Sequence, residues 1–495
     1  MEFEDLPPKA DAMIASMRAI GYDLPMAIAD IVDNSIYAKA QTIVIDYDWN
    51  DGDPWIRIFD DGSGMSEENL REAMRLGSQG PGEMRDPDDL GRFGLGLKTA
   101  SFSQCRIFSV RSKINGGATA TRCWNLDLIE RTKSWSLSKS SPIDAECLLD
   151  VLDNVENGTV VLWQHLDRIV DSLHESEKAR ETFLNKFNDV RVHLEMVFHR
   201  FLSGPGSIKM FIGRTPLRPW DPFLLTNNFT QPLSSSEKYE DGSVKIIPYV
   251  LPHVSNRTAE ETERGRGPKG WNAQQGFYVY RNRRMIVSGG YLDLNYKPEE
   301  HYKLARILVD LKNSTDNEWH IDVKKATVIP PDRLRMALDK VARATREEAV
   351  KVYRVRTQRS RGKGTKKNRD VWVKRRKGDK IIYQINQENE VIKKIIEELA
   401  PPEPWVRKLF DTIERTIPHR EIEIDAYDRE DCHVDLPPEI CPPDQSLIDL
   451  CKEFYWRFRE EGREHNEAVD LTISVEPFNT HPAFRATLDK IAEEE

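Results

Sequence analysis

Residues 60–65 read Asp60-Asp61-Gly62-Ser63-Gly64-Met65, and this string decides the fold. It follows an apolar run at 56–59, and an earlier apolar run lies at Val44 and Ile45; both runs predict short strands. A carboxylate at a strand end, followed by two glycines, can occupy a pocket while the backbone turns tightly away. Such a carboxylate accepts a hydrogen bond from an exocyclic amine, and the glycines let a base lie close to the main chain. By itself the pattern is usually an ordinary turn, so its meaning depends on its neighbours.

A helix that carries two polar side chains is predicted upstream. Residues 29–35 read Ala-Asp-Ile-Val-Asp-Asn-Ser, and the apolar stripe that predicts the helix is formed by Ile28, Ile31, Val32 and Ile36. Asp30 and Asn34 are four residues apart and therefore project from one face. The Asn34 amide oxygen can ligate Mg²⁺, which prefers oxygen ligands, and the Asp30 carboxylate can orient or deprotonate a water. For this pair alone, the alternative is a solvated polar face of the helix.

A glycine-rich loop is predicted downstream. Residues 91–98 read Gly-Arg-Phe-Gly-Leu-Gly-Leu-Lys, and a helical pattern covers 97–101. Glycines that run into a helix start leave backbone amides to point at anions, which makes a cradle for phosphates. The spacing of a Walker loop is absent, and residues 86–89 form a polar loop where a dinucleotide-binding unit would have a strand.

In this order, the three segments resemble the motifs of the GHKL ATPases, the superfamily of type II topoisomerases, MutL, heat-shock chaperones and histidine kinases. A fourth match is Gly158-Thr159 followed by three apolar residues, where a threonine assists adenine binding. The resemblance implies ATP and Mg²⁺ as cofactors, with Asp30 as the catalytic acid and Asn34 as the metal ligand. The cofactor-binding residues that it implies are Asn34, Asp60, Gly62, Gly64, Met65, Gly91, Gly94, Leu95, Gly96, Leu97, Lys98 and Thr159.

Within that superfamily the chain looks most like the MORC and MutL-like branch, including its bacterial relatives. The evidence is the string at 91–101 and Ala-Met-Arg-Leu-Gly-Ser at 73–78. Residues 276–287 predict two strands around a tight polar turn, similar to the hairpin that opens a ribosomal-S5-like transducer domain. The segment that ends at Lys325 resembles the one that sends a lysine to the terminal phosphate; Lys325 is the better candidate and Lys324 is the alternative.

The predicted fold class is α/β, an α+β sandwich in which a helix layer covers a mixed sheet. We expect a GHKL (Bergerat-fold) ATP-binding domain at 1–205, an S5-like transducer domain at 206–345, a basic linker at 346–370 and a C-terminal α+β interaction domain at 371–495. Within the first domain, the polar stretch 66–90 is expected to be a mobile lid over ATP.

Further elements are predicted from apolar spacing outside the motifs. They are a long helix at 178–201, strands at 371–374 and 380–386, and helices at 391–399, 405–417 and 447–458. No catalytic signature accompanies the elements after residue 370. We therefore expect that part of the chain to bind a partner.

Asp30 departs from the family pattern, because most relatives carry glutamate at this position. Aspartate is one methylene shorter, so its oxygens reach the attacking water only with backbone adjustment. Three outcomes of this substitution are possible: slow hydrolysis, hydrolysis through a second water, or ATP binding without turnover. Asp33 is a weaker candidate base, since it lies about 300° round the helix from Asp30 at about 100° per residue.

The composition, 39% hydrophobic and 31% charged over 495 residues, is typical of a soluble protein with sizeable cores. No apolar run approaches the length of a membrane span, and the acidic start at 1–5 lacks a signal-peptide pattern. Six cysteines are scattered without a Cys-x-x-Cys unit, so we expect reduced thiols in a cytoplasmic protein. The less favoured alternative is a metal site that contains Cys432, His433, Cys441 and Cys451.

The net charge of −10 conceals a strongly basic segment. Residues 351–380 contain 14 lysines and arginines but only two acids, a local charge of +12. The centre of this segment, 359–369, has two glycines and no apolar side chain, which predicts a mobile linker or loop. DNA phosphates are a fitting partner, bound without sequence preference and weakened by salt. The alternative is a solvated linker.

Two classes of function follow from the resemblance. The first is an ATP-driven clamp, in which ATP closes the lid, dimerises two ATPase domains and traps DNA or docks a partner. The second is a nucleotide-gated scaffold that hardly hydrolyses ATP and recruits an effector protein through the C-terminal domain. Bacterial relatives often occur in DNA-modification and anti-phage systems, which makes defence a hypothesis. A histidine kinase is disfavoured because residues 1–29 contain no histidine, and a nuclease because the sequence has no other acidic metal-binding cluster.

Overall fold

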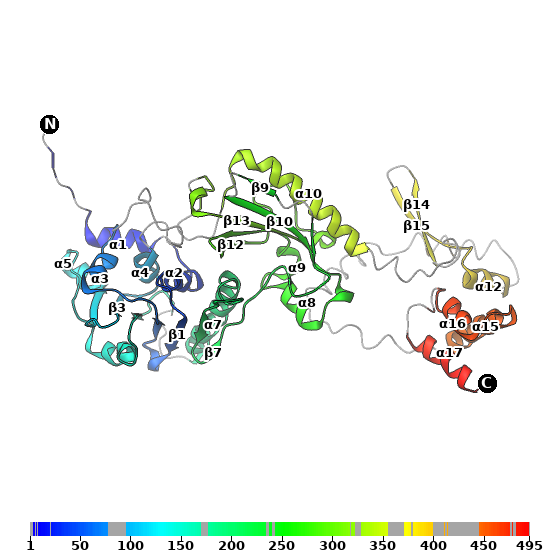
Figure 1. The fold of residues 1–495 in the computed structure, drawn as a ribbon, viewed down its shortest axis with the longest axis horizontal. Coiled ribbons are helices and arrows are strands. Elements are labelled where there is room, and N and C mark those ends of the chain that lie inside the picture. Colours follow the sequence, from blue (N-terminus) through cyan, green and yellow to red (C-terminus); the bar gives the residue numbers. More distant parts are fainter. Residues whose placement is uncertain are drawn as a thin grey trace. The chain divides into compact units, whose positions relative to one another are not determined.

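The computed structural model divides into two compact units, Met1–Val350 and Lys351–Glu495 (Figure 1). The residues that it describes are 3–4, 6, 8–19, 21–77, 96–169, 177–233, 237–239, 243–316, 318–321, 328–354, 371–377, 380–398, 410, 413, 445–475, 478 and 482–494. Within these ranges, we find no helix that is both long enough and apolar enough to span a bilayer.

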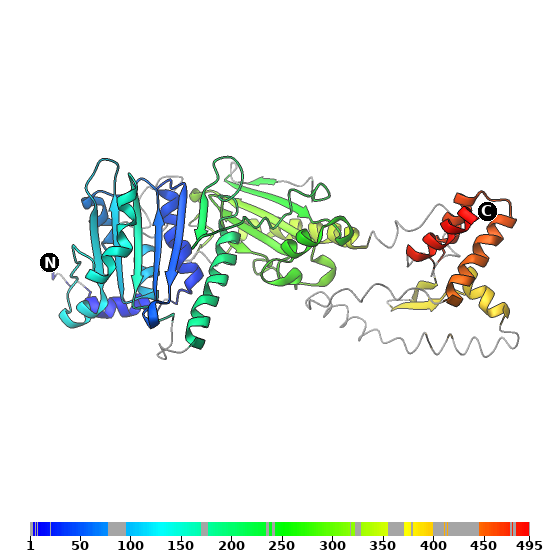
Figure 2. The same ribbon diagram turned by 90° about the horizontal axis from the view of Figure 1, so that it is seen from below.

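The first unit contains a seven-stranded mixed sheet in the order β4-β3-β5-β2-β1-β6-β7. Its strands are β1 (Thr42–Asp48), β2 (Trp55–Asp60), β3 (Ile107–Lys113), β4 (Ala120–Asn125), β5 (Gly158–Gln164), β6 (Lys209–Ile212) and β7 (Thr215–Pro216). Neighbouring strands are antiparallel, except that β1 and β6 are parallel. Figure 2 shows the strands side by side. The two strands predicted on either side of residue 50 are β1 and β2.

Side chains along the central strands alternate between two apolar layers, because successive residues of a strand point to opposite faces. On β2, Ile56 and Ile58 join the larger core, whereas Phe59 joins a smaller core on the opposite face. The smaller core is closed by η2 (Ile143–Ala145), α6 (Glu146–Leu149) and η3 (Asp150–Asn154). Asp60 therefore faces the same side of the sheet as Ile56 and Ile58.

Helices supply the other half of the larger core. They are α1 (Ala10–Arg18), α2 (Leu24–Tyr37), α3 (Glu67–Met74), α4 (Gly96–Gln104), α5 (Leu126–Thr132) and α7 (Glu177–Val197). The helix predicted around residues 28–36 is α2. It begins after Asp23, whose side chain accepts a hydrogen bond from the Met26 N–H at 2.8 Å. Pro25 occupies the first turn, where its missing N–H costs nothing.

The stretch that was expected to form a lid begins with a helix packed on the core. Helix α3 starts after Ser66, whose hydroxyl accepts a hydrogen bond from the Asn69 N–H at 3.2 Å. Leu70 and Met74, four residues apart and therefore on one helix face, are buried in the larger core. These two side chains anchor the helix although the residues around them are polar. The rest of the expected lid, 78–90, lies outside the described residues.

A second sheet in the first unit has the order β12-β11-β13-β10-β8, with β9 also paired to β10. Its strands are β8 (Gln231–Pro232), β9 (Glu237–Tyr239), β10 (Val244–Val250), β11 (Gly276–Arg281), β12 (Arg284–Ser288) and β13 (Ala305–Leu311), and the helices of this region are α8 (Ala259–Arg266), α9 (Gly270–Ala273) and α10 (Asp332–Arg354). The hairpin predicted at 276–287 is formed by β11 and β12. Its turn residues Asn282 and Arg283 both have positive φ, as a type I′ turn requires.

The two sheets share one apolar core. Tyr278 and Tyr280 of β11, Met285 of β12 and Leu308 of β13 belong to the same cluster as the buried faces of α2 and α7. His199, which follows α7, contacts the Tyr280 hydroxyl through Nε2 at 2.9 Å. Burial lowers the pKa of His199 to about 3, so this imidazole is neutral at pH 7. The second sheet is thus packed directly against the helix layer of the first.

The second unit contains a hairpin and a helical cluster. Strands β14 (Trp372–Lys377) and β15 (Lys380–Ile385) pair antiparallel, and the helices are α12 (Glu390–Glu398), α15 (Gln445–Glu460), α16 (His465–Thr472) and α17 (Pro482–Glu494). Their core includes Val391, Cys451, Phe454, Tyr455, Val469 and Phe484. The strands predicted after 370 correspond to β14 and β15, and the helices predicted at 391–399 and 447–458 correspond to α12 and α15. The helix predicted at 405–417 falls, apart from 410 and 413, outside the described residues.

Candidate nucleotide site

Three neighbouring strands place a carboxylate and two hydroxyls in one row. Asp60, the last residue of β2, is opposite Thr159 of β5, and Thr159 is opposite Ser112 of β3. Paired residues of adjacent strands point to the same face, so all three side chains face the helix layer. The hydroxyl oxygens of Ser112 and Thr159 are 2.9 Å apart, and the Met65 N–H donates to Ser112 Oγ at 2.8 Å. The row therefore joins Asp60 and Thr159, which are predicted to bind adenine, and contacts the backbone of Met65, which is predicted to bind the cofactor.

The Asp60 carboxylate accepts hydrogen bonds from α2 and from the loop that follows β2. Ser35 Oγ on α2 donates to Oδ2 at 2.8 Å, and the Gly62 N–H donates to Oδ1 at 3.0 Å. Burial raises the pKa of Asp60 to about 6, while both hydrogen bonds favour the ionised form. At pH 7 the group is mainly a carboxylate, although it is only 6% exposed. Each carboxylate oxygen accepts more than one hydrogen bond, so Asp60 has capacity left for an exocyclic amine.

Close backbone packing requires the glycines of the opening string. A Cβ on Gly64 would lie 1.9 Å from the carbonyl oxygen of Lys113 at the end of β3, and the φ of Gly64 is +67°. A Cβ on Gly62 would lie 2.8 Å from the Cβ of Ala38, which follows α2. The loop thus passes between the end of α2 and the sheet with no room for a side chain.

Gly64→Ala is expected to lower the free energy of unfolding of the first unit by about 3 kcal/mol or more, because the new methyl group meets backbone rather than a flexible side chain. Gly116→Ala is the matched control, since Gly116 has a φ of +68° but open space around it. The control should lose only about 1–2 kcal/mol for its left-handed backbone. Urea unfolding measures both losses, and equal losses would contradict the steric argument.

Asp30 lies in the middle of α2, beside the start of α4. Its side chain is buried, and the Tyr22 hydroxyl donates to Oδ2 at 2.9 Å. Burial is the main reason why the pKa of Tyr22 is raised, so this hydroxyl stays protonated and remains a donor. A Cβ on Gly96, the first residue of α4, would lie 3.5 Å from Asp30 Oδ2. The candidate base therefore adjoins a helix N-terminus, where backbone N–H groups attract anions.

The other predicted residues have different surroundings. Asn34, one turn after Asp30, is exposed to solvent. Lys98 is buried, and its Nζ donates to the Ala73 carbonyl oxygen of α3 at 2.9 Å. Burial lowers the pKa of Lys98 to about 8. Leu97 and Met65 pack partly against the larger core. Five predicted residues lie outside the described ranges: Gly91, Gly94, Leu95, Lys324 and Lys325.

The structure adds residues that the sequence analysis missed. Ser35 holds Asp60, Ser112 joins Thr159, and Tyr22 holds Asp30. A sequence signal existed for Ser112, because it continues the alternation of Phe108 and Val110, which point into the larger core. The contact made by Tyr22 has no periodic signal.

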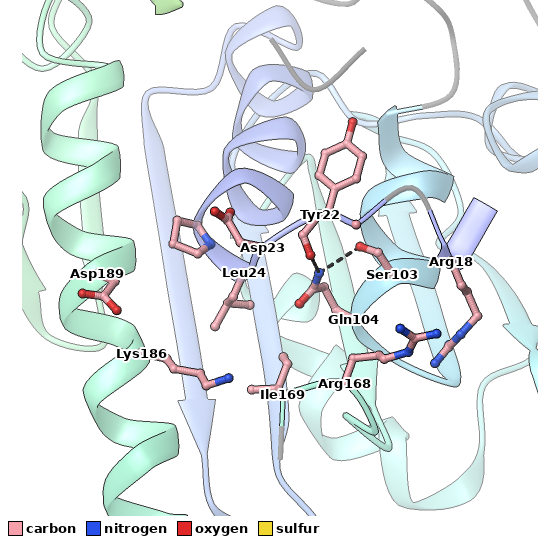
Figure 3. Close-up of a pocket in the computed structure, with 12 residues that line it drawn as sticks. Arg18, Tyr22, Asp23, Leu24, Ser103, Gln104, Arg168, Ile169, Lys186 and Asp189 are labelled. Carbon is pink, nitrogen blue, oxygen red and sulfur yellow. Dashed lines mark hydrogen bonds between the residues drawn. The ribbon is translucent and has the colours of Figure 1, made fainter. Parts of the chain in front are cut away.

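A cavity of about 550 Å³ lies at the opposite end of α4 from Gly96. Its lining includes Ser103 and Gln104, near the C-terminus of α4, together with Lys186 of α7 (Figure 3). Gln104 Nε2 donates to the backbone carbonyl oxygen of Tyr22 at 3.1 Å, whereas the Tyr22 ring is directed away from Gln104 (Figure 3). This cavity is therefore separate from the row formed by Asp60, Thr159 and Ser112.

In the part of the chain that the structure describes, no three His, Cys, Asp or Glu side chains form a group that could hold a metal ion. The predicted magnesium ligand, Asn34, carries an amide oxygen at an exposed position of α2, and oxygen is the ligand type that Mg²⁺ prefers. The described cysteines are free, and burial raises the pKa of Cys105, Cys123 and Cys451. Cys432, His433 and Cys441 lie outside the described residues.

The first unit thus contains an α/β domain with a buried carboxylate at a strand end, glycines in close contact with the sheet and a second carboxylate beside a helix N-terminus. A family model described as "Histidine kinase-, DNA gyrase B-, and HSP90-like ATPase" matches residues 22–159. The matched range includes Asp30, Asp60 and Thr159 and supports GHKL superfamily membership. Domains of this type are typically ATPases that bind ATP with Mg²⁺ and commonly dimerise. No curated protein matches the chain.

Proposed function

We propose that this protein is an ATP-dependent dimerising clamp that binds and hydrolyses ATP to engage DNA or a partner protein. The observation that carries the proposal is the buried Asp60 carboxylate, held by Ser35 and opposite Thr159, on the same side of the sheet as the helix with Asp30. The family match over residues 22–159 supports the ATP-binding part.

In the proposed site, Asp60 and Thr159 hold the adenine, while Gly62, Gly64 and Met65 let it lie against the main chain. Asp60 supplies the acceptor that an exocyclic amine needs, and its burial strengthens that hydrogen bond. The base would thus be selected by a hydrogen bond that an amine can donate and a carbonyl oxygen cannot.

At the phosphate end, the N-terminal turn of α4 with Gly96, Leu97 and Lys98 is proposed to hold phosphate oxygens. Asn34 would supply an oxygen to Mg²⁺, which neutralises charge on the phosphates when bound. Gly91, Gly94 and Leu95 are assigned to the same loop from the resemblance.

Asp30 is the proposed general base that orients the attacking water. Its position beside Gly96 brings a carboxylate to the helix N-terminus assigned to the phosphates. Lys325, with Lys324 as the alternative, is proposed to stabilise the charge that develops on the transferred phosphoryl group.

The proposed homodimer forms through the ATP-binding domain at 1–205, and the domain at 206–345 transmits the nucleotide state. DNA is proposed to bind the basic segment 351–380, which contains 14 lysines and arginines and two acids. The C-terminal domain at 371–495 is the proposed docking site for an effector protein.

A second candidate function is a nucleotide-gated scaffold with little hydrolysis. One observation favours it: both oxygens of the short Asp30 side chain already face protein groups, Tyr22 at 2.9 Å and Arg284 at 3.8 Å. In the scaffold, these contacts would hold Asp30 away from the attacking water. The C-terminal domain would then recruit the effector. A defence role is a hypothesis that rests on the resemblance.

Single-turnover hydrolysis with protein in excess over ATP tests the proposal, together with the mass in solution with and without a non-hydrolysable ATP analogue. We expect Mg²⁺-dependent cleavage and a shift from monomer to dimer with the analogue. ATP binding without cleavage would favour the scaffold. A monomer under all conditions, with DNA included, would contradict the clamp.

A further inference from the structure

A buried arginine from the second sheet reaches the helix that carries the candidate base. Arg284 is the first residue of β12, and its side chain is only 4% exposed. Its Nε lies 2.8 Å from Asp33 Oδ1, and its Nη2 lies 3.8 Å from Asp30 Oδ1. Both carboxylates are on α2, so a single guanidinium connects the second sheet to the candidate site.

Burying these charges costs free energy, which only close pairing and hydrogen bonds offset. Each buried ion loses several kcal/mol of hydration, and a well-packed apolar group in its place is often equally stable. The larger core already joins β11, β12 and α7 through apolar contacts. The charged contact is therefore not needed to hold the two sheets together.

The two carboxylates have unequal contacts with Arg284. Asp33 makes the close ion pair at 2.8 Å and fixes the guanidinium. The guanidinium then faces Asp30 Oδ1 at 3.8 Å, while the Tyr22 hydroxyl binds Oδ2 at 2.9 Å. The two oxygens of the Asp30 carboxylate therefore have different partners: Tyr22, which precedes α2, and Arg284 of the second sheet.

A cavity adjoins this contact. It has a volume of about 250 Å³, and its lining includes Arg284, Met285, Met26 and His193. Burial and the nearby charge of Arg284 lower the pKa of His193 to about 4, so His193 is neutral at pH 7 and leaves the charge balance unchanged. The cavity therefore leaves open space beside Arg284 on the side of His193, which belongs to α7.

We propose that Arg284 is a positioning residue for ATP hydrolysis: it holds the Asp30 carboxylate, through Asp33, in an orientation set by the second sheet. The inference rests on the proposed ATP hydrolysis. It implies that the rate of cleavage depends on the position of β12, so any partner that moves the second sheet alters turnover without touching the nucleotide.

The first test compares two single variants, in which methionine replaces Arg284 or its neighbour Arg283. Arg284→Met is expected to lower the single-turnover rate about 10- to 100-fold, because a misplaced base loses that much, while the Kd for ATP changes by less than about threefold. Arg284→Lys keeps the charge and should recover part of the rate. Arg283→Met is the matched control, since Arg283 is exposed and its guanidinium lies over the Phe201 ring; its rate should match the wild type.

A double variant separates positioning from folding. Arg284→Met leaves Asp33 buried without its ion pair, so the single variant is expected to unfold at lower urea. Asp33→Asn combined with Arg284→Met removes both charges and should restore the urea midpoint. If Arg284 only balances Asp33, the double variant also regains the hydrolysis rate, which would overturn the proposal. If Arg284 positions Asp30, the midpoint recovers and the rate stays low.

The failures are distinguishable. Wild-type protein that does not bind ATP contradicts the proposed function itself. Wild-type protein that binds but never cleaves ATP supports the scaffold and overturns the role of Arg284. Normal cleavage by Arg284→Met, with normal cleavage by the wild type, overturns the role of Arg284 alone.

Discussion

Asp30→Asn is expected to lower the rate of ATP cleavage about 100-fold or more, the usual contribution of a general base, while ATP still binds. The variant keeps the shape of the side chain and the hydrogen bond from Tyr22, whereas it cannot accept a proton from water. Asp33 keeps its ion pair with Arg284 at 2.8 Å, so the fold should survive. Single-turnover cleavage and equilibrium binding of ATP measure the two effects separately. Asp30→Ala, which removes the carboxylate entirely, should behave in the same way.

Asp23→Asn is the matched control for this prediction. Asp23 is on the same helix but caps its N-terminus at an exposed position, and asparagine caps as well as aspartate. Its cleavage rate should equal that of the wild type. Normal cleavage by Asp30→Asn would remove Asp30 from the catalytic assignment, and loss of ATP binding would place Asp30 in the binding site instead.

Asp60→Asn is expected to raise the Kd for ATP about 10- to 100-fold, because a hydrogen bond to a charged acceptor contributes about 1.5–3 kcal/mol. The amide oxygen can still accept from the Gly62 N–H, and the Ser35 hydroxyl can rotate to face the new NH₂ group. The variant should therefore fold. What it loses is the anionic acceptor for the exocyclic amine of adenine. Titration of a fluorescent ATP analogue, with competition by ATP, measures the change.

Two controls sharpen the test of Asp60. Inosine triphosphate lacks the exocyclic amine, so it should bind the wild type weakly. In Asp60→Asn, the difference in Kd between ATP and inosine triphosphate should be smaller. Asp48→Asn changes an exposed carboxylate at the far end of the neighbouring strand β1, and its Kd should be unchanged. Equal loss of affinity for both nucleotides in Asp60→Asn would mean that Asp60 does not contact the base.

Local sequence was sufficient to locate the elements that carry the site. The apolar alternation before Asp60 predicted β2, and the stripe around Asp30 predicted α2, because both patterns arise from the period of a single element. The polar stretch 66–90 was a partial exception. Leu70 and Met74 form a short apolar pair that anchors α3, but the predominance of polar neighbours favoured a loop.

Contacts between distant elements could not be predicted in this way. Ser35 binds Asp60 across 25 positions in the chain, and serine is too common on helices to indicate such a contact. Arg284 was recognised only as part of a hairpin. Its reach to Asp30 and Asp33 depends on how β12 packs against α2 and α7, which no periodicity encodes. The role of each site residue stays a prediction until its variant is measured.

The core that runs from α2 and α7 into β11, β12 and β13 has a consequence for how information crosses the first unit. If a flexible linker joined the two sheets, the second sheet could take many intermediate positions relative to the first. Interlocked side chains allow few arrangements, because close-packed interiors switch between discrete packings instead of deforming smoothly. A nucleotide bound beside α2 would then shift the first unit between discrete packing arrangements, and the second sheet would not move gradually.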